Sequence, residues 1–251
     1  MSQKDSQVSI EVSNISKTFV VKQNSIQSIR DYAFNILKKR KENQIISALS
    51  GVNFNILTGE TVGIIGRNGS GKSTLLNIIM GSIRADKGGI IKTHGRIIRL
   101  ALGMGIDLNL TARDNIYLNG SIIGLSFKKI GTIFSDIIEF AGLEDFVDTP
   151  VKFYSKGMKA RLNFSIAMHA EADVILLDEF FGGVGDQDFK KKSDEMFKQK
   201  ILEGKTIIIV SHSMSIIQKY CTRCIYIDKG KIIIDSHPKE VVQLYLNSFE
   251  N

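Results

Sequence analysis

The sequence predicts an α/β fold built around a parallel sheet, and three apolar runs with polar ends are the main reason. The runs are Thr61–Ile65, Val174–Leu177 and Thr206–Val210, and each is rich in Ile and Val on consecutive positions. Such runs are typical of strands that are buried on both faces of a sheet. Each run ends in polar residues or glycines, and ligands of open α/β sheets gather at the carboxyl ends of strands. We therefore expect the three ends to converge on one site.

The other elements are predicted in chain order. Two short strands are predicted at the N-terminus, over Val8–Val12 and Thr18–Val21. Near the C-terminus, Lys229-Gly230 indicates the turn of a hairpin between Cys224–Asp228 and Lys231–Asp235. Helical runs are predicted over Thr74–Met80, about Leu110–Pro150, Lys159–Ala170 and Lys239–Leu246, the last of them opened by Pro238.

The composition is that of an ordinary globular protein with a basic surface. A content of 43% hydrophobic and 24% charged residues excludes a disordered or fibrous chain. No apolar run approaches the roughly 18 residues of a membrane-spanning helix, and the first ten residues lack the pattern of a secretory signal. The 33 Lys and Arg residues against 26 Asp and Glu give a net charge of +7. This excess favours anionic ligands, which include nucleotides, nucleic acid and acidic lipid head groups.

The cysteines form a CxxC pair, Cys221 and Cys224. Two cysteines are too few for a disulfide framework, which fits a reducing compartment. A redox motif or half of a zinc site would also have this spacing, but no second CxxC or HxxxH lies nearby, and zinc needs four ligands. We therefore expect two half-buried thiols between a helix and a strand.

Residues 25–41 have the pattern of a basic amphipathic helix. Apolar residues recur at helical spacing and a basic run follows them, with Ile26, Ile29, Ala33 and Leu37 before Lys38-Lys39-Arg40-Lys41. Such a helix can lie at a membrane surface. It can equally pack on its own domain with a solvated basic end, and the sequence leaves both interpretations open.

A phosphate-binding loop follows the first apolar run, because the sequence there matches G-x-x-x-x-G-K-[ST] between a strand and a helical run. Its glycines let backbone N–H groups turn inward around phosphate oxygens at a helix N-terminus. Lys72 would reach the terminal phosphates, and the Ser73 hydroxyl would ligate Mg²⁺. The loop consists of Gly66, Arg67, Asn68, Gly69, Ser70, Gly71, Lys72 and Ser73, and Thr74 starts the helical run.

Ionisable residues end the other two apolar runs. Asp178 would hold Mg²⁺ through water, whereas Glu179 points elsewhere because side chains alternate along a strand. Glu179 could then position or deprotonate an attacking water, and His212 could hydrogen-bond a γ-phosphate. Two acids after an apolar run usually only cap a strand, and a lone histidine is more often structural. The phosphate loop favours the catalytic interpretation.

A second anion site is predicted at Tyr154-Ser155-Lys156-Gly157-Met158, which starts the helical run Lys159–Ala170. Ser155 and the N–H groups of this helix start would bind phosphate. One chain would then carry two phosphate-binding surfaces. The simplest use is two chains that share each nucleotide between the loop of one and this motif of the other.

The order of these motifs resembles the ATP-binding subunits of ABC transporters, and the resemblance covers essentially the whole chain. It implies that Gly66–Ser73 is the Walker A motif and that Ser155–Met158 is the signature motif. It further implies that Asp178 is the Walker B aspartate, Glu179 the catalytic glutamate and His212 the switch histidine. In this family Ser155 and Gly157 contact the γ-phosphate held by the opposite subunit. Phe19 is similar to the aromatic residue that stacks on adenine.

Within that family, the chain resembles the exporters of lipid-linked polysaccharides. Met158 stands where most cassettes have Gln, as in this subgroup, and Leu100–Gly105 is similar to the subgroup's leucine-glycine-rich loop. Ala101 departs from the pattern, which usually carries an acid there, and Lys156 replaces a small residue. The resemblance places Asp186 as the subunit-facing aspartate of the D-loop.

The resemblance implies a single cassette over residues 1–251, with a helical subdomain at about 90–170 and no C-terminal carbohydrate-binding domain. It implies a head-to-tail homodimer with ATP and Mg²⁺ at the interface, attached to a membrane permease at the cytoplasmic face of the inner membrane. The cargo would be a lipid-linked O-antigen, capsule or teichoic acid, and residues 25–41 would face the permease or the lipid head group. Two alternatives remain: export of another substrate, or a soluble ABC ATPase that acts on nucleic acid or ribosomes. The preferred interpretation includes no nucleic-acid partner.

Overall fold

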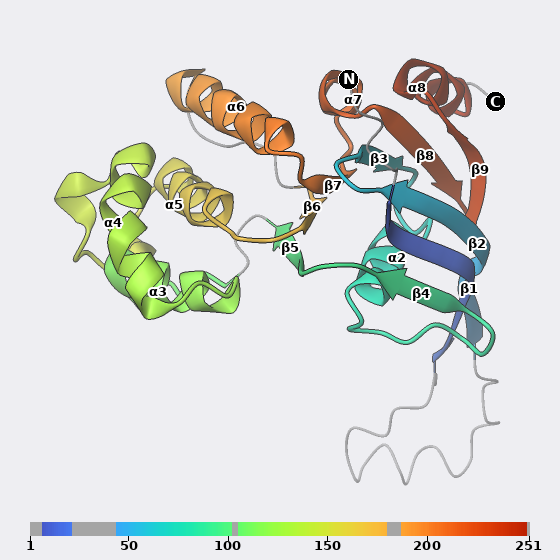
Figure 1. Cartoon of the computed structure of the whole chain (residues 1–251), viewed down its shortest axis with the longest axis horizontal. Helices are drawn as coiled ribbons and strands as arrows, with labels where there is room; N and C mark the ends of the chain where they lie inside the picture. The colour runs from blue at the N-terminus through green and yellow to red at the C-terminus, as the bar shows by residue number, and fades with distance from the viewer. Residues whose placement is uncertain (1–6, 22–43, 102–104, 180–186, 250–251) are drawn as a thin grey trace, which may run out of the picture.

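Two sheets form the body of the protein, and helices cover both faces of the larger one (Figure 1). The computed structural model describes residues 7–21, 44–101, 105–179 and 187–249. The larger sheet has six strands in the order β5-β6-β7-β3-β8-β9, and the smaller has three in the order β2-β1-β4. The strands of the larger sheet are β3 (Thr61–Ile65), β5 (Ile97–Ala101), β6 (Val174–Asp178), β7 (Thr206–Val210), β8 (Arg223–Asp228) and β9 (Lys231–Ser236). Those of the smaller sheet are β1 (Val8–Val21), β2 (Gln44–Leu57) and β4 (Ile90–Thr93).

The three apolar runs form adjacent parallel strands, as their pattern predicts. β6 pairs with β7, and β7 pairs with β3. Every residue of β3 and β7 is buried, because helices cover one face and the smaller sheet and α2 cover the other. β8 extends the parallel part, and β9 adds an antiparallel edge. The α/β fold with a mixed sheet is confirmed, and the carboxyl ends of β6, β7 and β3 lie at one edge.

The smaller sheet differs from the expectation of two short N-terminal strands. β1 is one continuous strand, with register shifts against β2 between Val12 and Thr18. Asn14 there has a φ of 52°, and its N–H donates to Asn53 Oδ1 at 2.7 Å. These bulges break the alternation of buried and exposed residues, which is why the sequence pattern suggested two pieces. β2, β4 and β5 were not predicted at all.

The helices are α2 (Lys72–Ile79), α3 (Ala112–Ile122), α4 (Phe127–Ala141), α5 (Lys156–Met168), α6 (Gln187–Leu202), α7 (Met214–Tyr220) and α8 (Pro238–Asn247). Short 3₁₀ turns lie at Glu144–Phe146 and Val151–Phe153. α8 begins at Pro238 as predicted. α5 begins before the predicted Lys159, because Ser155 caps it. None of the helices in the described ranges has the length and apolarity required to cross a bilayer.

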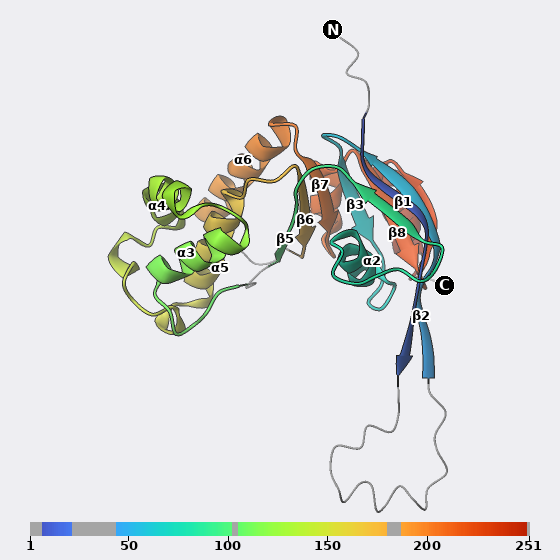
Figure 2. The ribbon, with the colours of Figure 1, turned by 60° about the horizontal axis from the view of Figure 1, so that its bottom comes forward.

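The helical layer begins later than the expected boundary at residue 90. Residues 90–101 contribute β4 to the smaller sheet and β5 to the edge of the larger one. The helical part starts with α3, whose N-cap Thr111 forms a capping box with Asp114. Helices α3, α4 and α5 enclose a core of their own, which includes Ile116 and Leu162. Figure 2 shows this layer to one side of the sheet.

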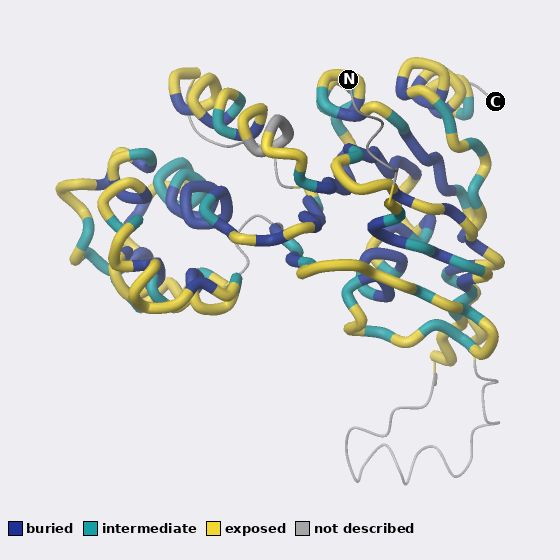
Figure 3. The backbone as a smooth tube through the Cα atoms, viewed as in Figure 1, coloured by how far each residue is buried: buried dark blue, intermediate teal, exposed yellow. Residues whose placement is uncertain are grey.

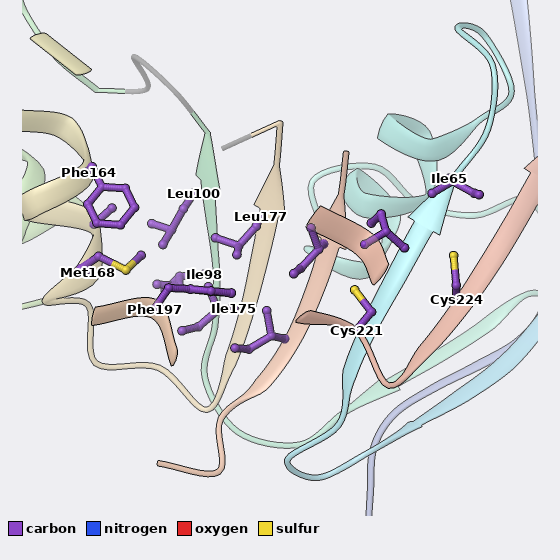
Figure 4. Packing of buried hydrophobic residues seen from close by; sticks show 14 of the residues in the cluster. Ile65, Ile98, Leu100, Phe164, Met168, Ile175, Leu177, Phe197, Cys221 and Cys224 are labelled. Carbon is purple, nitrogen blue, oxygen red and sulfur yellow. The ribbon is translucent and has the colours of Figure 1, made fainter. Parts of the chain in front are cut away.

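The buried residues form one apolar cluster on each face of the larger sheet. Burial is concentrated in its strands and in the inward sides of the helices (Figure 3). On the face covered by α5 to α8, Leu100 and Leu177 lie near Phe164 (Figure 4). On the other face, Leu75 and Leu76 of α2 pack against β3 and the smaller sheet. The phosphate-loop helix is therefore anchored between the two sheets.

The CxxC pair is buried rather than reactive. Cys221 and Cys224 are free thiols in the buried cluster on one face of the larger sheet, which also contains Ile65 (Figure 4). Burial raises the pKa of the Cys221 thiol, and it raises that of Cys224 to about 12. Only the thiolate is a good nucleophile or metal ligand. The described residues hold no cluster of His, Cys, Asp and Glu that could bind a metal ion.

We expect both cysteines to resist thiol reagents in the folded protein. At pH 8, a disulfide reagent such as DTNB should label them at least about 100-fold more slowly than in guanidinium chloride, because burial keeps them as thiols. The measurement is absorbance at 412 nm over time. Fast labelling of the folded protein would show that the pair is accessible.

Candidate active site

A glycine-rich loop connects β3 to α2 at the carboxyl edge of the sheet. Gly66, Gly69 and Gly71 have φ values of 156°, 78° and 107°. A Cβ on Gly66 would lie 2.2 Å from Ile227 O, and one on Gly71 would lie 2.4 Å from Ala48 O. Neither contact is sterically tolerable, so the loop takes this path only with glycine at both positions. The bordering strands β2 and β8 thus hold the loop in place.

We expect Gly71→Ala to destabilise the protein by about 2–4 kcal/mol, because it combines a positive φ with a backbone clash. Gly204→Ala is the matched control, since Gly204 also has a positive φ of 75° but nothing lies within 4 Å of its Cβ position. Its cost should be about 1 kcal/mol. Urea unfolding followed by circular dichroism measures both. Equal losses would mean that the contact with β2 does not constrain the loop.

Lys72 lies inside the loop, and only 7% of the residue is exposed. Its ammonium donates to Gly66 O at 2.7 Å and to Arg67 O at 3.0 Å. Burial lowers the pKa of Lys72, and the nearby carboxylates of Glu179 and Asp178 act in the opposite direction. The ammonium therefore points back into the loop, where the carboxylates of both acids act on it electrostatically.

The loop has donors that nothing in the described chain uses. α2 begins at Lys72 with Gly71 as its N-cap, so no side chain caps its first amides. Ser70 Oγ is buried, and among the described residues it has no hydrogen-bond partner. A buried hydroxyl without a partner and an uncapped helix start both favour an anion. Ser73 is exposed at the same helix start.

Glu179 and His212 meet at the ends of neighbouring strands. Glu179 follows β6 and has a φ of 51°, which is rare for a residue with a side chain. Its N–H donates to Val210 O on β7 at 2.9 Å. Its Oε1 lies 3.0 Å from His212 Nε2. An unusual backbone conformation held by the neighbouring strand is common at functional sites.

Arg99 also belongs to this site, although it was not predicted. Its Nη2 donates to Asp178 Oδ2 in a short ion pair, and its Nη1 donates to Asn77 Oδ1 at 2.6 Å. Asn77 lies on α2, so the guanidinium connects the loop helix to the end of β6. The signal in the sequence was a charge inside an otherwise apolar run, Ile97–Ala101.

The signature motif lies in the helical layer, apart from the loop. Ser155 is the N-cap of α5, and its Oγ accepts a hydrogen bond from the Met158 N–H at 3.1 Å. Ser155 and Lys156 are exposed, whereas Gly157 and Met158 are partly buried. Figure 2 shows α5 on the opposite side of β5 from α2. The structure therefore does not bring this motif to the loop of the same chain.

Phe19 and Arg67 lie at the border of the loop. Phe19 is registered with Ile46 on β2, two residues before Ala48, which contacts the loop. The residue is 36% exposed, and Lys17 Nζ lies 5.5 Å from the ring centroid. Arg67 lies over the ring of Phe249 at 4.4 Å and donates to Ser248 O at 2.5 Å.

Of the predicted site residues, the structure gathers the phosphate loop, Asp178, Glu179 and His212 at one edge. Asn68 is exposed in the loop, and Thr74 lies in the first turn of α2. The expected D-loop residue Asp186 and the expected basic helix over residues 25–41 lie outside the described residues. So do residues 102–104 of the leucine-glycine-rich loop, whereas Ala101 is registered with Asp178.

A glycine loop at the amino end of a buried helix, beside an acidic strand end, is the arrangement of phosphate-loop nucleotide-binding proteins. Comparison with known families shows to which family of nucleotide-binding proteins the chain belongs. The family model described as ABC transporter matches residues 49–182. The chain belongs to the ABC transporter family of ATP-binding cassettes, and the resemblance read from its motifs is confirmed.

Curated relatives carry names from export systems. The O-antigen export ATP-binding protein RfbB of Klebsiella pneumoniae is 36% identical over 243 residues, which cover 94% of this chain and 96% of that protein. The ABC transporter protein AbcA of Aeromonas salmonicida is 36% identical, over 94% of this chain and 75% of that protein. The teichoic acids export protein TagH of Lactococcus lactis is 43% identical over 79% of this chain, which spans only 42% of TagH.

Solved structures agree on the fold. A dimeric ATP-binding cassette, MJ0796, in a post-hydrolysis state bound to ADP and Pi, aligns with a TM-score of 0.69 over 91% of this chain and 98% of that chain. An ATP-binding subunit of an ABC transporter aligns with a TM-score of 0.70 over 94% and 92% of the two chains. Their identities are 23% and 19%, so they support the fold alone.

Proposed function

We propose that this chain is the ATP-hydrolysing subunit of an exporter of a lipid-linked polysaccharide, such as an O-antigen, a capsule or a teichoic acid. The contact of 3.0 Å between Glu179 and His212, next to the phosphate loop, carries the proposal of hydrolysis. The substrate class is supported by the relatives named for O-antigen and teichoic acid export. The subunit would work at the cytoplasmic face of the membrane, bound to a permease.

The loop residues would hold the nucleotide. The amides at the start of α2 and the Lys72 ammonium would bind the phosphates, and the unpartnered Ser70 hydroxyl lies in the same loop. Phe19 would pack against the base. Ser73 and Asp178 would hold Mg²⁺, which prefers hydroxyl and carboxylate oxygens. When bound, Mg²⁺ would neutralise charge that develops on the phosphates.

Glu179 would act on the attacking water. Its carboxylate acts electrostatically on Lys72 of the loop, whereas that of Asp178 is paired with Arg99, and His212 would orient the Glu179 carboxylate through Oε1. It would take the proton from water as the bond to phosphorus forms. The backbone of Glu179, held by Val210 O, fixes the position of this carboxylate relative to β7.

A second copy of the chain would complete each site. Ser155 and Gly157 lie in the helical layer, and α5 begins with an exposed N-cap. A helix start of this kind attracts phosphate. In a head-to-tail dimer, the motif of one copy would cover the nucleotide held by the loop of the other.

We expect a Glu179→Gln protein to form dimers with ATP and Mg²⁺, and Ser155→Asp in that background to prevent them. Asp remains a good N-cap for α5, so the helix is preserved, but its charge would repel the phosphate. Ser126→Asp is the matched control, because Ser126 caps α4 through the same hydrogen bond, from Lys129 N–H. Sedimentation velocity measures the result. Dimers with Ser155→Asp would contradict the proposed interface.

Export is tested in the cell. The chain should co-purify with an integral membrane protein, and its deletion should remove a surface glycan. The soluble alternative makes the opposite prediction: DNA binding that weakens steeply with salt, and no membrane partner.

A further inference from the structure

The guanidinium of Arg99 lies where a bound cation would be expected in this site. It contacts Asp178, the acid expected to serve Mg²⁺, and both side chains are largely buried, with 21% and 14% exposed. Arg99 also contacts Asn77, which lies one helical turn after Ser73 on the same face of α2. Arg99 thus links Asp178, one expected metal ligand, to the residue one helical turn after Ser73, the other expected ligand.

The strand register explains why Arg99 reaches this position. β5 pairs in parallel with β6. Arg99 lies opposite Leu176, and Ala101 lies opposite Asp178. Leu176 packs in the cluster that contains α2, so this face of both strands points to the loop helix. A long cationic side chain on this face, two residues before the strand end, meets the carboxylate of the neighbouring strand.

Arg99 is not bonded like a purely structural arginine. Its Nε is buried and has no hydrogen-bond partner among the residues described. Arg223, by contrast, uses Nε and Nη2 on Asp235, and its Nη1 donates to Asn55 O and Glu60. An unpaired buried donor is costly, and the contact with Asp178 offsets that cost only while Asp178 has no other cation.

We propose that Arg99 is a built-in competitor of the divalent cation: it neutralises Asp178 in the metal-free protein and thereby weakens the binding of Mg²⁺ with nucleotide. This inference rests on the proposed assignment of Asp178 to the metal. The positive charge of Arg99 repels a divalent ion bound nearby and so raises its free energy. Asp178 also attracts that ion less strongly while its own charge is neutralised by the guanidinium. Arg99 therefore sets the Mg²⁺ concentration at which the nucleotide site is filled.

The test uses the full chain with ADP and Mn²⁺ as the probe, followed by electron paramagnetic resonance. Arg99→Met removes the charge and keeps most of the side-chain length, and we expect it to lower the half-saturating Mn²⁺ concentration about tenfold. Arg99→Lys should stay within about twofold of the unmodified protein, because it keeps the charge. Arg223→Met, which removes a partly buried arginine from an ion pair at the amino end of β8, should not change Mn²⁺ binding.

A second readout is nucleotide affinity with and without metal. Without Arg99, Asp178 should repel the phosphates in EDTA, so the ratio of the ADP dissociation constants in EDTA and in Mg²⁺ should rise severalfold. If Arg99→Met does not fold, Arg99→Gln keeps two hydrogen-bonding groups without charge and should show the same direction.

Two outcomes would overturn the inference, and they differ. Unchanged or weaker Mn²⁺ binding in Arg99→Met, with weaker binding in Asp178→Asn, would show that the metal site is correct and that Arg99 does not compete. Unchanged binding in Asp178→Asn would refute the metal assignment itself, and with it this inference.

Discussion

A Glu179→Gln protein should bind ATP as tightly as the unmodified chain and hydrolyse it about 10²–10⁴-fold more slowly, the range that a general base contributes. Glutamine keeps the shape of glutamate and the hydrogen bond to His212, but it cannot accept a proton at the position 3.0 Å from Nε2. The backbone at φ 51° is equally rare for both residues, so folding should be preserved. Phosphate release measures the turnover, and fluorescence of a labelled nucleotide measures the binding.

The control for this change is Glu171→Gln. Glu171 forms an exposed ion pair with Lys129 at 3.2 Å in the helical layer, so its loss should leave turnover unchanged. Hydrolysis at the normal rate in Glu179→Gln would remove Glu179 as the base.

A Lys72→Ala protein should lose nucleotide affinity by about 100-fold or more, because charge-assisted hydrogen bonds contribute about 1.5–3 kcal/mol each. In the present structure the ammonium bonds to Gly66 O and Arg67 O inside the loop. Phosphate oxygens would replace these carbonyls as partners, and the alanine side chain has neither a charge nor a hydrogen-bond donor for them. Isothermal titration with ATP and Mg²⁺ measures the change.

Lys87→Ala serves as the control, because Lys87 is an exposed lysine outside the loop and its removal changes the net charge by the same amount. Its affinity should match that of the unmodified chain. Unchanged affinity in Lys72→Ala would refute the assignment of the phosphate loop, whatever the result for Glu179.

The elements that sequence patterns predicted best are uniformly buried strands and segments whose signal is local. β3 and β7 are buried at all positions, so their apolar runs are continuous and need no knowledge of a partner. α8 begins at Pro238, and its start signal is local. The phosphate loop is local as well, because its glycines are required by backbone conformation at those positions.

The missed strands depend on partners that are distant in the sequence. β2 is exposed at many positions and is held by pairing with β1 through several register shifts, so its burial pattern lacks a regular period. β4 has no buried residue and exists because it pairs with β1. For the same reason the helical layer was expected from about residue 90, whereas residues 90–101 belong to the two sheets.

The sequence by itself predicted the phosphate loop and the acids and histidine at strand ends, because each of these motifs lies within a few adjacent residues. The order of the motifs along the chain then indicated the family. Only the tertiary structure decided that Arg99 meets Asp178 and that the motif at Ser155 lies away from the loop of its own chain. Both facts depend on strand order and register, which arise from packing between segments about 80 residues apart or more. The partner of a charged residue inside an apolar strand can be identified only when the neighbouring strand is known.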